Sequence, residues 1–234
     1  MNIIVTGASR GIGFETVKIF AQDGQNNVFA LARGKAGLEE LQQACRNISG
    51  IDNVHIFPFD LLNGNYRAIL IPEILQKMKS VDILVNNAGM LIQKPFEMME
   101  GSDFDVMFNA NVKTAFNLTR HLLPHFSKNA HIVNIGSMGG FQGSAKFPGL
   151  SLYSASKGAL AILTECLAEE FIGRQIKVNC LALGSAQTEM LEQAFPGYKA
   201  LLSAAEMAAF IADFALHGHQ WFNGKVLPVA VSTP

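Results

Sequence analysis

Short apolar runs alternate with amphipathic stretches along the whole chain. The runs are rich in β-branched residues and lie at 3–6, 28–32, 54–57, 81–86, 131–135, 176–183 and 225–231. Between them, apolar residues recur at helical spacing after residue 12 and after residue 38, and again over 103–126 and 153–172. The pattern predicts seven strands that alternate with helices.

The predicted strands are apolar nearly from end to end. Such strands are buried on both faces, as in a parallel sheet between two layers of helices. We therefore expect an α/β fold with a doubly wound seven-stranded parallel sheet in three layers. Pro72 should start or kink a helix, and Pro228 places the last strand at a sheet edge. The sequence SAAE at 203–206 is typical of a capping box that opens the final helix.

Composition narrows the range of partners. The chain has 234 residues and fits one domain, 1–234, with 18 basic and 19 acidic residues and a net charge of −1. This charge disfavours binding to nucleic acid or to an anionic membrane surface. No apolar run reaches the roughly 20 residues of a membrane span. Three cysteines without a C-x-x-C pair, and an amino terminus without a targeting pattern, lead us to expect a cytoplasmic protein without a metal site.

A glycine-rich loop, TGASRGIG at 6–13, follows the first predicted strand and opens a helix. Glycines at 7, 11 and 13 let an anionic group approach the free N–H groups of the helix start. The spacing G-x-x-x-G-x-G differs from the G-x-G-x-x-G pattern, and the G-K-S/T of a P-loop is absent. We interpret the loop as a dinucleotide phosphate cradle, with a purely structural turn as the alternative.

The second predicted strand ends in LARGK and has no acidic residue that would bind the adenosine ribose of NAD. Arg33 in this segment and Arg10 in the glycine loop are suited to a 2′-phosphate, because guanidinium groups bind phosphate oxygens in pairs. The pattern favours NADP(H) over NAD. Two ordinary solvated arginines are the alternative.

The sequence YSASK at 153–157 places Tyr153 and Lys157 on one helix face, about 5–6 Å apart. An ammonium at that distance is expected to lower the pKa of the phenol by up to about two units, from its usual value near 10. The pair is thus a candidate proton donor, with a chance pair on a solvated face as the alternative.

Together these segments resemble the short-chain dehydrogenases/reductases over essentially the whole chain. The matching segments are TGASRGIG at 6–13, NNAG at 86–89, Asn111 in NVKT, Ser137 in NIGS and YSASK. The resemblance implies a Rossmann fold and a catalytic set of Asn111, Ser137, Tyr153 and Lys157. It also implies that Asn111 holds a water molecule and that Lys157 binds the nicotinamide ribose. The cofactor-binding residues then expected are Gly7, Ser9, Arg10, Gly11, Ile12, Gly13, Arg33, Asp60, Leu61, Asn87, Ala88, Gly89, Tyr153, Lys157, Gly184 and Thr188.

Three departures from the family pattern affect the expected site. Ser137 and Tyr153 lie 16 residues apart, about three more than the family pattern leads us to expect, so Ser144 and Ser151 compete for the role of the serine. Leu183 replaces a proline before Gly184. The substrate-binding segment near 185–203 is short, which predicts an open or shallow site.

We therefore expect an NADP(H)-dependent oxidoreductase that interconverts a carbonyl and a secondary alcohol, with a 3-oxoacyl thioester as the first substrate to consider. An NAD-dependent alcohol, sugar or steroid dehydrogenase is an alternative, as is a non-catalytic dinucleotide-sensing protein. The resemblance also implies a homo-oligomer, a dimer or tetramer. His121 and His125 have metal-binding spacing but no carboxylate partner, and we expect no metal there.

Overall fold

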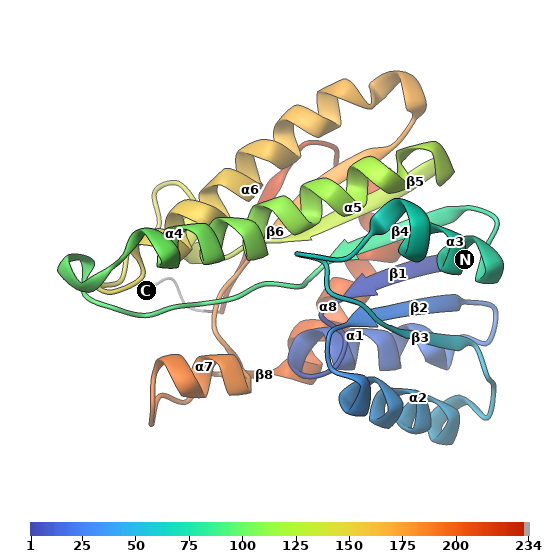
Figure 1. Cartoon of the computed structure of the whole chain (residues 1–234), viewed down its shortest axis with the longest axis horizontal. Coiled ribbons are helices and arrows are strands. Elements are labelled where there is room, and N and C mark those ends of the chain that lie inside the picture. The colour runs from blue at the N-terminus through green and yellow to red at the C-terminus, as the bar shows by residue number, and fades with distance from the viewer. Residues whose placement is uncertain (232–234) are drawn as a thin grey trace.

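A computed structural model describes residues 1–231 of the chain (Figure 1). These residues form nine strands and eight α-helices. The strands of the main sheet are β1 (Asn2–Thr6), β2 (Asn27–Ala32), β3 (Val54–Pro58), β4 (Val81–Asn86), β5 (Phe126–Ile135), β6 (Lys177–Leu183) and β9 (Val226–Val229). The helices are α1 (Gly11–Gln22), α2 (Lys35–Ser49), α3 (Ile71–Lys77), α4 (Gly101–Phe108), α5 (Thr114–Leu122), α6 (Ser151–Glu170), α7 (Glu189–Ala194) and α8 (Ala204–His217). Two-residue strands β7 (Ala186–Gln187) and β8 (Leu202–Ser203) flank α7.

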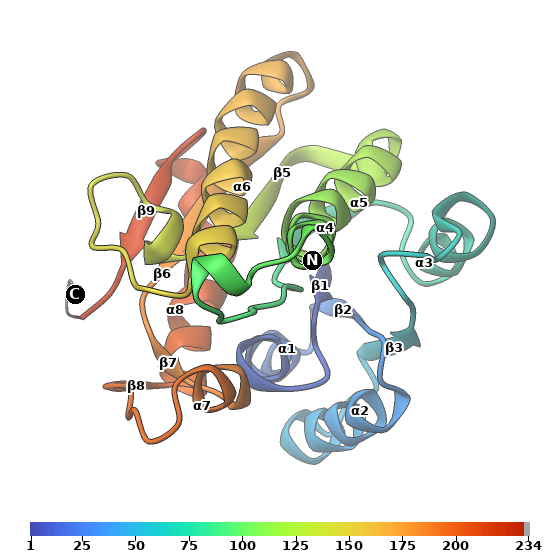
Figure 2. The same ribbon diagram turned by 60° about the vertical axis from the view of Figure 1, so that its left-hand side comes forward.

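The seven long strands form one sheet in the order β3-β2-β1-β4-β5-β6-β9. All of their pairings are parallel. Helices α1 and α2 lie on one side of the sheet, and α3 and α5 lie on the other (Figure 2). The expected doubly wound α/β fold with three layers is confirmed.

The side chains of β1 show why the strands are apolar throughout. Ile3 and Val5 join a core cluster with residues of α1, α2 and α8, whereas Ile4 between them joins a second cluster with residues of α3 and α5. Successive side chains of a strand point to opposite faces. Because helices cover both faces, β1 buries every residue from Ile3 to Thr6.

Local predictions based on proline and capping are confirmed. Pro72 stands in the first turn of α3, directly after a π-helical segment, η1 (Tyr66–Leu70). Pro228 lies in β9, which is an edge strand. The Ser203 hydroxyl accepts from the Glu206 N–H at 3.2 Å, and the Glu206 carboxylate accepts from the Ser203 N–H at 2.8 Å, which completes the capping box of α8.

The helix expected over 103–126 is wrong in its continuity and at its end. A π-helical segment, η3 (Asn109–Lys113), separates α4 from α5, and a short 3₁₀ turn, η4 (Leu123–His125), ends the helical region. Phe126 already belongs to β5. Periodicity of apolar residues does not reveal a π-segment, because one wider turn shifts the helix face by only one residue.

His131 in β5 is a buried polar residue whose hydrogen bonds require the neutral ring. Its Nδ1 donates to the Ala215 carbonyl at 2.9 Å, and its Nε2 accepts from the Asn179 side chain at 3.0 Å. Burial, opposed by the bond to Ala215 and assisted by His219, lowers the pKa of His131 to about 4. A charged ring would lose the Asn179 hydrogen bond.

The unfolded chain therefore binds a proton at this position between about pH 6.5 and pH 4 that the folded chain excludes. We expect the free energy of unfolding to decrease by about 2 kcal/mol from pH 7 to pH 5 through His131. Urea titrations at the two pH values measure this change. The variant His131→Gln should lose most of that slope, and an unchanged slope would contradict the assignment.

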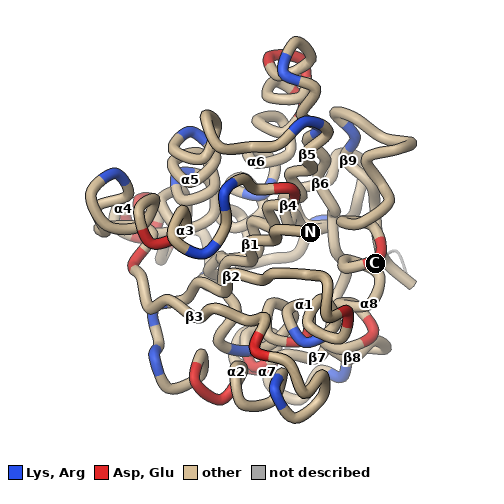
Figure 3. The backbone as a smooth tube through the Cα atoms, turned by 90° about the vertical axis from the view of Figure 1, so that its right-hand side faces the viewer, with Lys and Arg blue, Asp and Glu red and all other residues tan. Residues whose placement is uncertain are grey.

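The surface carries charges of both signs, interspersed along the chain (Figure 3). Within residues 1–231, no helix combines the length and the apolar character needed to cross a membrane.

Candidate active site

The strand order reverses between β1 and β4, and this reversal defines a site. In a doubly wound sheet, ligands bind beyond the carboxyl ends of the strands at such a switch point. β1 ends at Thr6 and leads into the glycine loop, and β4 ends at Asn86 and leads into NNAG. The Thr6 hydroxyl accepts hydrogen bonds from the N–H groups of Asn87 at 3.0 Å and Ala88 at 2.9 Å, so it ties the two motifs together.

The glycine loop needs glycine for two separate reasons. Gly7 and Gly11 have φ of +68° and +60°, which side chains disfavour. Gly13 instead packs too closely for a side chain, since a Cβ would lie 2.4 Å from the Gly7 carbonyl oxygen and 2.5 Å from Asn87 Nδ2. Asn87 Nδ2 donates to the Thr6 carbonyl at 3.0 Å. These contacts fix the loop at the start of α1 and leave its N–H groups free of side chains.

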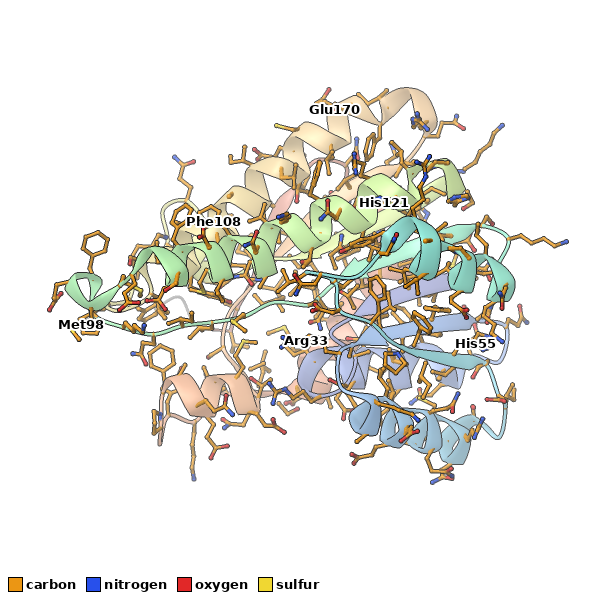
Figure 4. The ribbon with its side chains drawn as sticks, in the orientation of Figure 1. Arg33, His55, Met98, Phe108, His121 and Glu170 are labelled. Atoms are coloured by element: carbon orange, nitrogen blue, oxygen red, sulfur yellow. The ribbon has the colours of Figure 1, made fainter. Side chains whose placement is uncertain are left out.

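The expected adenosine-binding residues lie beyond the ends of β2 and β3. Arg33 is exposed just past β2 (Figure 4). Asp60 uses its carboxylate within its own turn, where it accepts from the Leu62 N–H and the Asn63 side chain, both at 2.9 Å. These two bonds are the main cause of its lowered pKa, and Arg33 contributes to it. The Leu61 side chain is buried in the core, so only its backbone is available to a ligand.

The other residues of the glycine loop differ in exposure. Ser9 lies against Gly37 of α2, where a Cβ would be 2.5 Å from the Ser9 carbonyl oxygen. Ile12 is half-buried, and its side chain packs against the core. Arg10 is exposed and forms an ion pair with Glu189 at 2.7 Å. The structure therefore directs Arg10 to the first residue of α7.

The expected catalytic residues converge beside the carboxyl end of β5. Ser137 follows β5, Tyr153 and Lys157 lie in the first turns of α6, and Lys157 Nζ is 5.9 Å from the centre of the Tyr153 ring. The Ser137 hydroxyl lies close enough to the Tyr153 phenol to act on its pKa. The two competing serines lie elsewhere: Ser144 donates to the Phe141 carbonyl at 2.9 Å, and Ser151 is an exposed residue at the start of α6.

The expected shift of the Tyr153 pKa is wrong in direction. Burial raises the pKa of Tyr153, and the nearby Ser137 hydroxyl opposes this effect only in part. The ammonium of Lys157 is directed elsewhere, since Nζ donates to the Ile135 carbonyl at 2.8 Å. Helix spacing correctly predicted that Tyr153 and Lys157 are close. It does not determine which group accepts the hydrogen bond of the lysine ammonium.

Lys157 is enclosed, with only 5% of its surface exposed. This burial lowers its pKa to about 8, although Cys180 acts in the opposite direction. Lys157 therefore keeps its proton at neutral pH. A Cβ on Gly89 would lie 3.3 Å from Nζ and 2.9 Å from Asn111 Oδ1, so the absence of a side chain there leaves room beside the ammonium.

Asn111 lies in the π-helical segment η3 and holds the chain that follows NNAG. Its Oδ1 accepts from the Met90 N–H at 2.7 Å, while its Nδ2 donates to the Met90 carbonyl and to the Ser156 hydroxyl, both at 2.9 Å. Sequence analysis missed Ser156, although it stands inside YSASK. The role expected for Asn111, holding a water molecule, stays a prediction.

The longer connection between Ser137 and Tyr153 covers the segment after NNAG. The Lys94 N–H donates to the Gly149 carbonyl at 3.1 Å, and Gly149 has φ of +80°.

The end of β6 departs from the family pattern without interrupting the sheet. Leu183, which replaces the family's proline, continues β6 and pairs with Val229. Gly184 follows and donates its N–H to the Val229 carbonyl at 2.8 Å, so its observed role is to extend the sheet.

The segment 185–203 contains β7, α7 and β8 and projects beyond the same end of the sheet as the glycine loop (Figure 1). Thr188 caps α7 by accepting from the Leu191 N–H at 3.2 Å, and its methyl group lies near Gly11. A hollow of about 150 Å³ lies between α7 and the segment after NNAG, lined by Leu91, Gln93, Met190, Gln193 and Ala194. A larger hollow, of about 210 Å³, lies near the amino ends of the strands, away from these residues.

The fold, with a glycine loop at the switch point of its sheet, is typical of a class of protein, the dinucleotide-binding oxidoreductases. Comparison with known proteins agrees. The sequence model of the short chain dehydrogenase family matches residues 1–199. The chain therefore belongs to the short-chain dehydrogenase/reductase family.

Individual relatives extend the match. The chain is 33% identical over 192 residues to a 3-oxoacyl-[acyl-carrier-protein] reductase of Thermotoga maritima, covering 81% of this chain and 76% of the relative. It resembles a 3-ketoacyl-(acyl-carrier-protein) reductase of Brucella melitensis solved with NADH, with a TM-score of 0.85, 28% identity and coverage of 97% and 96%. It also resembles a short chain dehydrogenase of Escherichia coli CFT073 solved with NADPH, with a TM-score of 0.87, 26% identity and coverage of 97% and 95%.

Proposed function

We propose that the protein reduces a 3-oxoacyl thioester, or a related ketone, with NADPH. The observation that carries this proposal is that Tyr153 and Lys157 lie together near Ser137, with Lys157 next to Gly89 of the NNAG segment, which in turn contacts the glycine loop. The relative from Thermotoga maritima supports the substrate class. The exposed Arg33, without an acidic residue beside it in LARGK, supports NADP(H), as does the Escherichia coli structure with NADPH.

The residues of the site fit a nicotinamide dinucleotide, because the loop at 7–13 exposes backbone N–H groups and Gly89 leaves space beside Lys157. When bound, the nicotinamide supplies a hydride to the carbonyl carbon. Tyr153 donates its proton to the carbonyl oxygen, and its raised pKa keeps that proton in place until negative charge develops. Ser137 holds and polarises the same oxygen. Lys157 binds the nicotinamide ribose and contributes a positive charge.

An NAD-dependent alcohol dehydrogenase is the second candidate, and one observation favours it: the Brucella melitensis reductase was solved with NADH. The third candidate, a dinucleotide sensor, has no need of a complete proton-transfer set. A panel of 3-oxoacyl thioesters, simple ketones and secondary alcohols, each assayed with both cofactors, separates the three. Turnover with NADPH and thioesters supports the proposal, and inactivity toward every substrate would favour the sensor.

Replacing Arg33 with Ala is expected to raise the Kd of NADPH by at least about ten-fold, because a charge-assisted bond to a phosphate contributes roughly 1.5–3 kcal/mol. The Kd of NADH should change little, since NADH has no 2′-phosphate. Fluorescence titration of both cofactors measures this difference. Arg174→Ala, at a basic residue of the turn after α6, is the control, and equal effects on NADPH and NADH would contradict the role of Arg33.

We also infer that the protein acts as a homo-oligomer in the cytoplasm. Phe104 of α4, Phe116 of α5 and Ile162 of α6 expose 46%, 43% and 60% of their surface, which is costly on a monomer. Size-exclusion chromatography with light scattering tests the oligomeric state, and a monomer at micromolar concentration would contradict it.

A further inference from the structure

The ion pair between Arg10 and Glu189 joins two parts of the site that are 179 residues apart in the sequence. Arg10 immediately precedes α1, and Glu189 is the first residue of α7. The neighbouring residues also lie close together, since a Cβ added to Gly11 would lie 3.6 Å from the Thr188 methyl group. The glycine loop thus contacts the segment that is expected to cover the substrate.

In the proposed function, Arg10 is also expected to bind the 2′-phosphate of NADP(H), together with Arg33. The observed pair uses one guanidinium nitrogen, Nη1, at 2.7 Å from Glu189 Oε2, and leaves the side chain of Arg10 60% exposed. A phosphate brought to the same guanidinium would stand close to the Glu189 carboxylate. Two anions at that distance repel each other, so the carboxylate and the phosphate compete for Arg10.

We propose that Glu189 is a determinant of cofactor selectivity, and that its carboxylate weakens binding of the 2′-phosphate by occupying Arg10. This inference rests on the proposed use of NADP(H). The preference for NADPH over NADH is then set by three residues: Arg33 and Arg10 strengthen it, and Glu189 limits it.

Two adenosine nucleotides that differ only in the 2′-phosphate test the proposal: adenosine 2′,5′-bisphosphate and 5′-AMP, titrated by calorimetry. The variant Glu189→Gln is expected to bind the bisphosphate about two- to five-fold more tightly, the range measured for exposed ion pairs. Binding of 5′-AMP should not change. Glu192→Gln is the matched control, because it removes the same charge from the same helix at an exposed position for which the described residues form no ion pair.

A second experiment tests whether the effect of Glu189 depends on its ion pair with Arg10. In Arg10→Met, the further change Glu189→Gln should have no effect on the bisphosphate, because the group for which the two anions compete is gone. Weaker or unchanged binding of the bisphosphate to Glu189→Gln would overturn the proposal, since it would mean that Glu189 orients Arg10 for the phosphate or has no influence. Equal gains in Glu189→Gln and Glu192→Gln would also overturn it.

The failure of the inference is distinguishable from the failure of the proposed function. If the unmodified protein binds the bisphosphate and 5′-AMP equally, the proposal that it uses NADP(H) is wrong. The proposed role of Glu189 is then wrong as well. If the unmodified protein prefers the bisphosphate but Glu189→Gln leaves that preference unchanged, only the role of Glu189 is wrong.

Discussion

Replacing Tyr153 with Phe is expected to lower kcat by about 10²–10⁴-fold, the usual contribution of a positioned general acid. The ring still fills its half-buried place beside Ser137, so the Kd of NADPH should stay within about two-fold. Stopped-flow measurement of NADPH oxidation gives kcat, and fluorescence titration gives Kd. The separation between the two effects identifies Tyr153 as the proton donor.

Tyr66→Phe is a matched control for the same chemical change. The Tyr66 hydroxyl donates to the Leu61 carbonyl in the core and has no access to a substrate. The control should lose only about 1 kcal/mol of stability. Retention of full turnover by Tyr153→Phe would refute the proposed mechanism, and loss of NADPH binding in that variant would indicate a structural role instead.

Replacing Gly13 with Ala is expected to weaken NADPH binding by at least about ten-fold and to lower the free energy of unfolding by about 1–3 kcal/mol. The added Cβ would meet backbone and the fixed amide of Asn87 within 2.5 Å, so the glycine loop must move away from β4. Such a shift misaligns the N–H groups that the pyrophosphate requires. Thermal unfolding with and without NADPH measures both effects.

Gly101→Ala is the control, because a Cβ there meets no atom within 4 Å and the residue begins α4. It should be neutral or slightly stabilising. If Gly13→Ala also retained wild-type stability and affinity, the close packing of the loop against Asn87 would not be a requirement of the site.

The sequence predicted the fold because its signals are local and consistent. Each strand of the seven-stranded sheet contains an apolar run, and Gly7, Pro72, Pro228 and the capping box at Ser203 act within a few residues of their own positions. The residues expected to be catalytic could be located in the fold for a related reason. Each follows a recognisable strand or lies in the helix that follows one.

Features that depend on contacts between distant segments were not predictable. The pairing of Arg10 with Glu189 and the bond from Asn111 to Ser156 each join segments whose relative placement only the folded chain defines. The pKa of Tyr153 belongs to the same group. The pKa of Tyr153 is raised by burial, while the Lys157 ammonium donates its hydrogen bond to the Ile135 carbonyl. Neither observation follows from helical spacing.

The position of β1 in the centre of the sheet has a consequence for synthesis of the protein. The backbone N–H of Asn2 donates to Asp82, a partner 80 residues further along the chain. Ribosomes add about 5–20 residues per second, so the first strand is made several seconds before β4, while only β2 is available to pair with it. A nascent chain that stops before residue 81 leaves one edge of β1 unpaired, and such edges promote aggregation.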